Sequence, residues 1–451
     1  MSTATGVQDA AEAGRPERSA WPRRVAQRLA GLPSWAAAAL GVLAWIAALA
    51  AVAPLVRGYL TSAPDQRLVD LDVYRTGGLS VLRGQPLYAM LTQPPQLLAF
   101  TYPPAAALFA VPLALMPWPA AQLAWVPFVY VPLAVVIWYA FAPLLHRSGR
   151  MRPVAFAAVF VVCAYLFPVR DEMRFGQVDM VLLGLAVADC AARRPWWPRG
   201  ALIGLATAIK LVPGVFIVYL WLSGRRRAAL TAALVALVCT LGAWLLLPHD
   251  SVTYWTSAVF DPGRLGSNAG TSDQSLRGLL LRVFLPARLP GLIWVAVAGA
   301  VAVAGFALVR RLARDSREPA APGGHIGPAA PGGHIGPAAP GGQISMEAIA
   351  VTALVGALVS PVSWIHYYVV VVVAIGAILA DGRDPRRVIV AAGTAVYFAL
   401  TTPWWGQSLL GQRGVPVLAA RMVQDSFGIA ALALIAVLAW WRAAVPRAPA
   451  D

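Results

Sequence analysis

Two aspartates two residues apart, Asp70 and Asp72, are the strongest candidates for acid–base chemistry in this sequence. They lie in VDLDVYRTGGLSVLRGQPLY, a segment rich in tyrosine and arginine that follows the first long apolar run. A carboxylate partly removed from water has a raised pKa and can act as a general base on a hydroxyl group. The alternative is a pair of solvated loop acids that pair with Arg67 or Arg75, and composition alone favours this alternative.

Lys210 is the candidate for binding an anion. It is the only lysine of the chain, and it interrupts an apolar run over residues 201–221 together with Pro213. A charged residue in such surroundings is costly, and it usually lines a cavity or a pathway. The functional interpretation is a point charge for a group such as a phosphate. The alternative is a structural lysine that snorkels to the interface or pairs with Asp189.

Three further segments mix aromatic and hydrogen-bonding side chains between apolar runs. SPVSWIHYY holds Trp364, His366 and Tyr367, which could contact a phosphate or sugar or could form an interfacial aromatic belt. SDQSLRG holds Gln274 and Arg277. This segment and RFGQVD suit the same ligands, but the residues alone favour ordinary polar turns. Trp404 and Trp405 are better explained as interfacial anchors than as a sugar platform.

The composition predicts that a bundle of membrane helices positions these residues. Of the 451 residues, 59% are hydrophobic and 12% are charged, where a soluble protein has about 25% charged residues. Apolar runs of bilayer length recur along the chain, and ten-residue alternation typical of a barrel is absent. We therefore predict an all-α polytopic membrane protein with about ten to twelve transmembrane helices.

The net charge of +16 does not indicate a nucleic-acid partner, because the cations form short clusters between apolar runs. Such clusters are typical of cytoplasmic loops. They place residues 248–285, SPVSWIHYY and residues 403–425 outside. In the first half, a hairpin of two short helices through Lys210 keeps the basic breaks inside and turns Lys210 outward. The three cysteines are scattered in apolar runs and indicate neither a disulfide nor a metal framework.

The predicted organisation has five parts. Two of the parts consist of membrane helices. The linker between these two parts holds the repeats PAAPGGHIG, which are too rich in Pro and Gly to pack. The parts are a disordered cytoplasmic tail (1–34), an N-terminal transmembrane catalytic module (35–312) with a large exterior loop (57–103), a low-complexity cytoplasmic linker (313–345), C-terminal transmembrane helices (346–442) and a cytoplasmic tail (443–451).

Six segments in order carry a family resemblance: DLDVYRTGGLSVLRGQPLY, FTYPP, FGQVDM, GLATAIKLVP, SDQSLRG and SPVSWIHYY. Together they resemble the actinobacterial polyprenol-phosphate-mannose-dependent α-(1→2)-mannosyltransferases, glycosyltransferase family 87 of the GT-C class. The resemblance implies a GT-C-like bundle in the plasma membrane, with its active site on the extracytoplasmic face. It also implies a polyprenyl-phosphate sugar as donor and a glycolipid or glycan hydroxyl as acceptor.

The resemblance assigns roles to individual residues. The family's catalytic aspartate falls on Asp70, and Asp72 is the second choice because relatives often have His there. His366 matches the first histidine of SPxSWxHH, whereas Tyr367 replaces the second, and Asp179 replaces the Asn of GQxN. In the implied mechanism Asp70 is the base of an inverting transfer. The residues then expected to bind substrate or phosphate are Lys210, Arg277, Gln274, Tyr102, Gln177, Trp364 and Tyr367.

Polyprenyl phosphate is a good leaving group at neutral pH, so no general acid is expected. No cofactor is expected either, and metal dependence stays open because no dense acidic cluster is visible. Two alternatives remain: a transporter or flippase of lipid-linked sugars, and a transferase of another polyprenyl-phosphate sugar such as arabinofuranose. A transporter predicts two similar halves with paired broken helices, whereas this sequence shows one Lys–Pro interruption and an unrepeated Asp70 segment.

Overall fold

The structure is a computed structural model that describes residues 32–63, 67–283, 289–315 and 345–443. Regular structure in these ranges is helical, and two isolated β-bridges join Leu91 to Ala99 and Asp273 to Trp364. The expected N-terminal tail, repeat linker and C-terminal tail lie almost wholly outside the described residues.

The helices follow one another along the chain, and the longest described connection, over residues 83–103, joins α3 to α4. Their bounds are α2 (Ser34–Thr61), α3 (Val69–Leu82), α4 (Pro104–Ala114), α5 (Trp118–Ala140), α6 (Ala142–Arg147), η1 (Gly149–Met151), α7 (Arg152–Ala164), α8 (Phe167–Phe175), α9 (Asp179–Ala191), α10 (Ala201–Ile209), η2 (Val212–Gly214), α11 (Val215–Leu222), α12 (Arg226–Leu246), α13 (Pro248–Thr256), η3 (Ala258–Phe260), η4 (Pro262–Leu265), α14 (Leu276–Val283), α15 (Leu289–Asp315), α16 (Met346–Val359), η5 (Ile365–Val370), α17 (Val371–Leu379), α18 (Pro385–Ala399), α19 (Thr402–Leu409), α20 (Val417–Gln424) and α21 (Ser426–Ala443).

Length and apolar composition identify the membrane helices. Within the described residues, α2, α5, α12 and most of α15 are long and apolar enough to cross a bilayer, and three bent helix pairs raise this number to 7. Four shorter apolar segments, 104–114, 212–222, 346–359 and 365–379, fall below that length. The prediction of an all-α polytopic membrane protein is confirmed. Ten to twelve spans are reached only if the shorter helices also cross.

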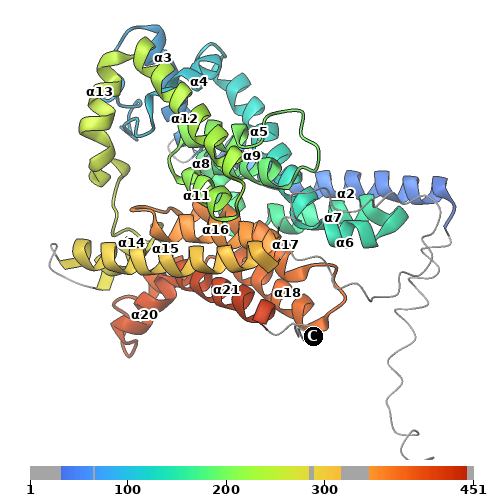
Figure 1. Ribbon diagram of the computed structural model, residues 1–451. Coiled ribbons are helices and arrows are strands. Elements are labelled where there is room, and N and C mark those ends of the chain that lie inside the picture. Colours follow the sequence, from blue (N-terminus) through green and yellow to red (C-terminus); the bar gives the residue numbers. More distant parts are fainter. Residues whose placement is uncertain (1–31, 64–66, 284–288, 316–344, 444–451) are drawn as a thin grey trace, which may run out of the picture.

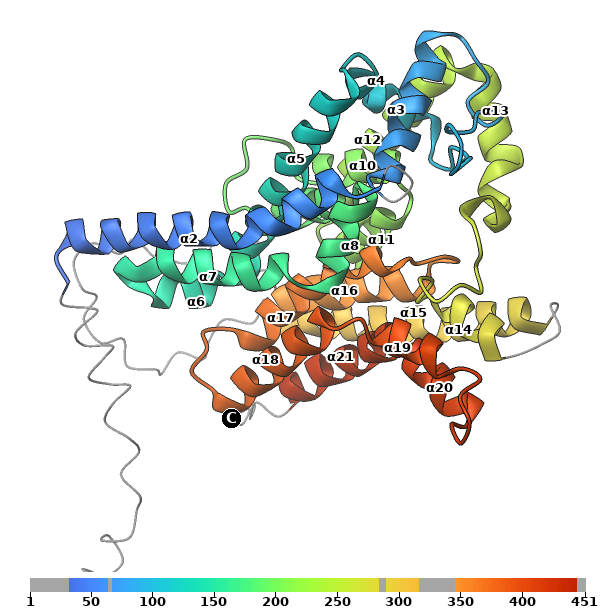
Figure 2. The ribbon, with the colours of Figure 1, turned by 180° about the vertical axis from the view of Figure 1, so that it is seen from behind.

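The core is built around α16 and α17. Every residue from Ala348 to Leu358 in α16 is buried, and so is every residue from Val371 to Ile378 in α17. A helix that is apolar on all sides has no solvent face and is covered by other helices. In Figure 1 α15 runs across α16 and α21, whereas α2 and α7 lie side by side at the edge of the molecule, as Figure 2 shows from behind.

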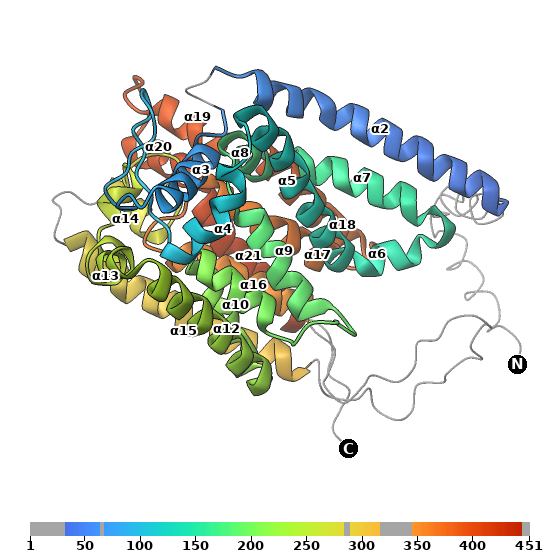
Figure 3. The same ribbon diagram turned by 90° about the horizontal axis from the view of Figure 1, so that it is seen from above.

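Residues 57–103, the segment expected to form a large exterior loop, are partly helical. Helix α2 continues to Thr61, and α3 follows after a short break. Leu71, Tyr74 and Gly78 recur at helical spacing and are all buried. A Cβ at Gly78 would lie 2.8 Å from the Ala110 carbonyl oxygen, so glycine lets α3 and α4 approach closely. Figures 1 and 3 show this pair side by side at one end of the molecule.

The apolar run through Lys210 forms a helical hairpin, as we predict for the first half of the chain. Helix α10 ends before Lys210, and η2 leads into α11. Gly200, at the start of α10, packs against Ala228 near the start of α12, and α11 joins α12 through residues 223–225. The start of α10 and the end of α11 therefore both lie beside the start of α12. Lys210 lies at the turn, away from the arginines at the start of α12.

Candidate active site

A close approach between the end of α8 and the start of α3 creates the site. The Leu68 N–H donates to the Arg174 carbonyl at 2.7 Å, and Leu68 has a positive φ of 50°. Gly176 ends α8 with a φ of 73°. A Cβ there would lie 2.8 Å from the Leu71 Cβ. The backbone after Gly176 can thus pass directly beside the first turn of α3, which carries Asp70.

Asp70 lies in a pocket of tyrosine and amide groups. Tyr74 donates to the Gln177 side-chain oxygen at 2.9 Å, and the Tyr102 hydroxyl lies 3.3 Å from the same oxygen. Gln177 in turn hydrogen-bonds to Asp70. Burial raises the pKa of Asp70 to about 7, although the Gln177 hydrogen bond and the charge of Lys210 both favour the ionised carboxylate. At neutral pH, Asp70 is therefore poised to accept a proton.

Lys210 is held by a carboxylate and an aromatic face. Its Nζ lies 2.8 Å from both carboxylate oxygens of Asp179, and both side chains are largely buried. The same nitrogen lies 3.8 Å from the centre of the Tyr367 ring. Such a cation–π contact is strengthened by desolvation. The ammonium group is thus neutralised within the site, and Asp179, not Asp189, is its partner.

His366 lies near two carboxylates, of which one is that of Asp179. Its Nδ1 lies 3.5 Å from Asp171 and its Nε2 lies 3.8 Å from Asp179, and the residue is 3% exposed. Both distances exceed a hydrogen bond, and both ring nitrogens are buried without a partner. Buried polar atoms normally have partners, so this unsatisfied pair marks His366 as a candidate for contact with a ligand or water.

A pocket extends from this cluster between α9, η2, α11, α16 and η5. It is partly open, and its volume of about 460 Å³ includes space that is open to the outside. Asp179 and Tyr367 line it, and most of its other lining residues are apolar, among them Leu183, Val215 and Phe216. The pocket therefore joins a polar end beside Lys210 to an apolar stretch between helices.

Comparisons with known proteins agree on one family. The profile of glycosyltransferase family 87 matches residues 100–323. A polyprenol-phosphate-mannose-dependent alpha-(1-2)-phosphatidylinositol mannoside mannosyltransferase of Mycolicibacterium smegmatis is 35% identical over 360 residues, covering 76% of each chain. This chain belongs to glycosyltransferase family 87.

Two further relatives of this family-87 glycosyltransferase come from Mycobacterium tuberculosis. The phosphatidylinositol mannoside mannosyltransferase of strain H37Rv is 33% identical, covering 72% of this chain and 73% of its own. A phosphatidylinositol pentamannoside mannosyltransferase of strain CDC 1551 is 30% identical, covering 77% of this chain and 76% of its own. No solved structure matches the chain.

The SDQSLRG segment of this family-87 enzyme lies against the segment that carries His366. The Gln274 N–H donates to the Ser363 carbonyl at 2.7 Å, and Asp273 and Trp364 form an antiparallel bridge. The Gln274 side-chain amide bonds to Thr271, Gln424, Phe427 and Gly428. Four bonds within the protein make Gln274 part of the framework. In contrast, the Nη1 of Arg277 is buried without a hydrogen-bond partner.

Asp72 is separated from Asp70 by the geometry of α3. Residues two apart on an α-helix point to nearly opposite sides. Asp72 is half-buried, and burial raises its pKa, whereas the charge of Arg75 and a hydrogen bond from Thr76 lower it. Its neighbours are thus residues of its own helix. Trp404 and Trp405 are both exposed on α19.

Three acids of the site were not among the predicted site residues. Asp171 and Glu172 lie on α8, and Asp179 begins α9. Glu172 is fully buried, with one carboxylate oxygen accepting the Met180 N–H at 2.8 Å and the other unpartnered. The signal in the sequence was the run VRDEMRFGQVD, whose three acids interrupt apolar surroundings. Asp189 instead accepts the N–H groups of Gly200 and Ile203 at the start of α10.

A metal centre is not formed by the residues that the structure describes. They include no group of three or more His, Cys, Asp or Glu side chains in a metal-binding arrangement. The carboxylates near Lys210 face an ammonium group and an imidazole, and hard divalent cations prefer all-oxygen ligand sets.

Proposed function

We propose that this family-87 glycosyltransferase transfers a mannosyl residue from polyprenol-phosphate mannose to a hydroxyl of a phosphatidylinositol mannoside. The product linkage is α-(1→2), and the reaction inverts the anomeric carbon. The printed names of three relatives support the donor and the acceptor class. The observation that carries the proposal is Asp70, which is half-buried and has a pKa raised to about 7, in one electrostatic cluster with Lys210.

The chemical step follows from the position of Asp70. Its carboxylate accepts the proton of the acceptor hydroxyl while the hydroxyl oxygen forms a bond to C1 of the donor sugar. The bond from C1 to the phosphate oxygen breaks on the opposite face, and polyprenyl phosphate leaves. A base with a pKa near the working pH is the most effective compromise between strength and availability. Tyr74 and Tyr102 hold Gln177, which orients the carboxylate.

Lys210, in the cluster with Asp70, and Arg277, in the segment that lies against the His366 segment, are the cations that we assign to the developing charge of the phosphate. Lys210 provides an ammonium group, and Arg277 provides a buried nitrogen without a partner. His366 provides two unpartnered ring nitrogens. To bind the donor, Lys210 exchanges one or both of its contacts with Asp179 for contacts with phosphate oxygens. Fixed charges in a desolvated site contribute more to such stabilisation than they would in water.

The lipid tail fits the apolar pocket beside Asp179 and Tyr367. Its apolar lining between helices suits an isoprenoid chain, and its polar end adjoins Lys210. We place this site on the extracytoplasmic face of the plasma membrane. The hairpin holds Lys210 at the end opposite the arginine cluster that precedes α12, and such clusters favour the cytoplasm.

The test is transfer by the purified protein in proteoliposomes that contain labelled polyprenol-phosphate mannose and a phosphatidylinositol mannoside. The expected product carries one additional hexose, and an α-(1→2)-specific mannosidase removes it. The Asp70→Asn variant is the matched control and forms no product. If donor crosses the bilayer without any sugar transfer, the protein is a transporter. If only another polyprenyl-phosphate sugar is used, the sugar assignment is wrong.

A further inference from the structure

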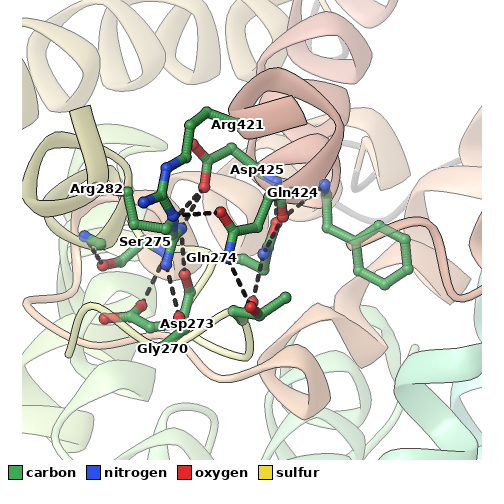
Figure 4. Close-up of polar contacts among 12 residues, drawn as sticks. Gly270, Asp273, Gln274, Ser275, Arg282, Arg421, Gln424 and Asp425 are labelled. Carbon is green, nitrogen blue, oxygen red and sulfur yellow. Dashed lines mark hydrogen bonds and ion pairs between the residues drawn. The ribbon is translucent and has the colours of Figure 1, made fainter. Parts of the chain in front are cut away.

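A buried polar network links the corner between α20 and α21 to the loop over residues 270–275. This loop in turn contacts the segment that carries His366. Arg282, in the last turn of α14, is the centre of the network (Figure 4). The side chains of Arg282 and Asp425 are 1% and 3% exposed. Two oppositely charged groups so far from solvent are costly unless other hydrogen bonds satisfy them.

Arg282 satisfies this condition through three partners. Its Nε donates to Asp425 at 2.6 Å, and its Nη2 forms an ion pair with the same carboxylate oxygen. Its Nη1 donates to the Gly270 carbonyl and its Nη2 to the Asp273 carbonyl, both at 2.6 Å. Figure 4 shows the guanidinium group between the carboxylate and these carbonyls. Arg282 thus fastens residues 270–273 to the C-terminal helices.

The carboxylate of Asp425 lies at a sharp corner between two helices. Helices α20 and α21 meet at Asp425 with a bend of 66°. Neighbouring Gln424 donates from its side chain to Thr271 at 2.6 Å, and its carbonyl accepts from Gln274 at 2.8 Å. The same corner therefore contacts the loop at several points. Among the residues labelled in Figure 4, Asp425 is the one that brings a carboxylate from the corner to Arg282.

The loop in turn holds the segment that precedes His366. One carboxylate oxygen of Asp273 accepts the N–H groups of Ser363 and Ser275, both at 2.9 Å. The Gln274 N–H donates to the Ser363 carbonyl at 2.7 Å. Both backbone groups of Ser363 are therefore bound by the loop. Only two residues separate Ser363 from His366, which leaves the histidine backbone little freedom.

We propose that Arg282, Asp425 and Asp273 are positioning residues that set the location of His366 relative to Asp171 and Asp179. They do not touch the reacting atoms, and they act through Ser363. The family match ends at residue 323, before Asp425. This inference rests on the proposed function, since it assigns His366 a part in stabilising the transition state. An imidazole displaced by about 1 Å can lose much of that effect.

The first experiment compares Asp425→Asn with a matched control, Asp381→Asn. Asp381 forms an exposed ion pair with Arg383 at 3.1 Å, so the control removes an ion pair without disturbing the network. We expect Asp425→Asn to lower kcat about tenfold or more, with donor KM changed less than threefold. The control is expected to keep both constants. An unchanged kcat in Asp425→Asn overturns the proposal.

The second experiment uses Asp273→Ala and Asp273→Asn, which guards against a poorly folded Asp425 variant. Alanine removes the acceptor for the Ser363 N–H, whereas asparagine retains a side-chain oxygen there. We expect Asp273→Ala to lower kcat and Asp273→Asn to restore most of it. In hydrogen exchange, the peptide over residues 360–368 should be less protected in Asp273→Ala, with α5 and α9 unchanged. Uniform loss of protection indicates a general structural role and overturns the proposal.

These outcomes can be told apart from failure of the proposed function. If the wild-type protein transfers no mannose, the exchange measurement still reports whether the network orders residues 360–368. If the wild type is active and Asp425→Asn is equally active, the proposed function stands and the positioning role is wrong.

Discussion

In the proposed mechanism, the charge of Asp70 favours the reaction, whereas its burial makes the same charge oppose folding. Burial raises its pKa from 3.8 to about 7. The folded protein therefore holds a proton between these values that the unfolded chain has released. The destabilising contribution is absent below about pH 4, grows as pH rises, and is complete above about pH 7. Functional sites often carry such a stability cost.

We expect Asp70→Asn to raise the thermal stability of the detergent-solubilised protein at pH 8. The difference from wild type should shrink as pH falls toward 4, because the wild-type carboxyl then becomes neutral as well. Thermal unfolding at pH 8 and pH 5 measures this effect. A variant that is less stable than wild type at both values contradicts the assignment of a raised pKa.

In the proposed mechanism, Asp179 competes with the donor for Lys210. Its two carboxylate oxygens both contact the ammonium group at 2.8 Å. We expect Asp179→Asn to lower the donor KM, by about tenfold if roughly 1.4 kcal/mol of competition is removed. The unliganded variant should unfold at a lower temperature, because a buried ammonium group loses its counter-ion. Donor titration and thermal unfolding measure both effects, and a raised KM would contradict the competition.

At the residue scale, the sequence singled out Asp70, Lys210 and His366, which the fold brings near one another, but it did not identify their partners. Asp70, Lys210 and His366 stood out as charged or titratable groups in apolar or aromatic surroundings. The partner of Lys210 was harder to identify, because Asp179 is 31 positions away in the sequence and only the fold brings the two side chains together. The predicted alternative, Asp189, lies at the other end of α9, where it binds backbone N–H groups of α10.

At the scale of elements, Gly176 lets the end of α8 pack closely against α3, the helix that carries Asp70. It combines a φ of 73° with a Cβ position 2.8 Å from Leu71. We expect Gly176→Ala to lower activity strongly and to destabilise the protein by about 1–3 kcal/mol. The matched control is Gly149→Ala, because Gly149 also has a positive φ, of 52°, but open space around its Cβ position.

The two glycine variants separate backbone strain from helix packing. Strain alone predicts similar losses of stability in both, with activity preserved. Packing against Leu71 predicts that only Gly176→Ala loses kcat, since it displaces the first turn of α3. Turnover and thermal unfolding of both variants decide between these outcomes.

Elements were predictable where apolar length or a helix breaker marked them. The hairpin through Lys210 followed from a charge and a proline inside one run, and the basic cluster after it favoured a return to the same side. Helix α3 was missed, because Asp70, Arg75 and Gly77 make its sequence look like a polar loop. Its buried face, which includes Leu71 and Tyr74, is recognised only when α4 and α8 are in place.

At the scale of the whole molecule, the account requires the site and the arginine clusters to lie on opposite sides of the membrane. Single cysteines at Arg226 and Ser408, in a background without native cysteines, test this topology. We expect an impermeant maleimide to label the Ser408→Cys variant in intact cells and to label Arg226→Cys only after lysis. Labelling of both positions from outside would contradict the arrangement.

The central claim is that Asp70 is the base that activates the acceptor hydroxyl. The most direct measurement is kcat of wild type, Asp70→Asn and Asp72→Asn between pH 5 and pH 9, with all three reconstituted at equal amounts. We expect wild-type kcat to rise with pH to a plateau above about pH 7, as the Asp70 carboxyl ionises. Asp70→Asn should lose roughly 100-fold to 10,000-fold on the plateau above pH 7 and less at pH 5, where the wild-type carboxyl is protonated as well, while Asp72→Asn keeps the wild-type profile. Wild-type turnover by Asp70→Asn, or a profile displaced only in Asp72→Asn, would contradict the account.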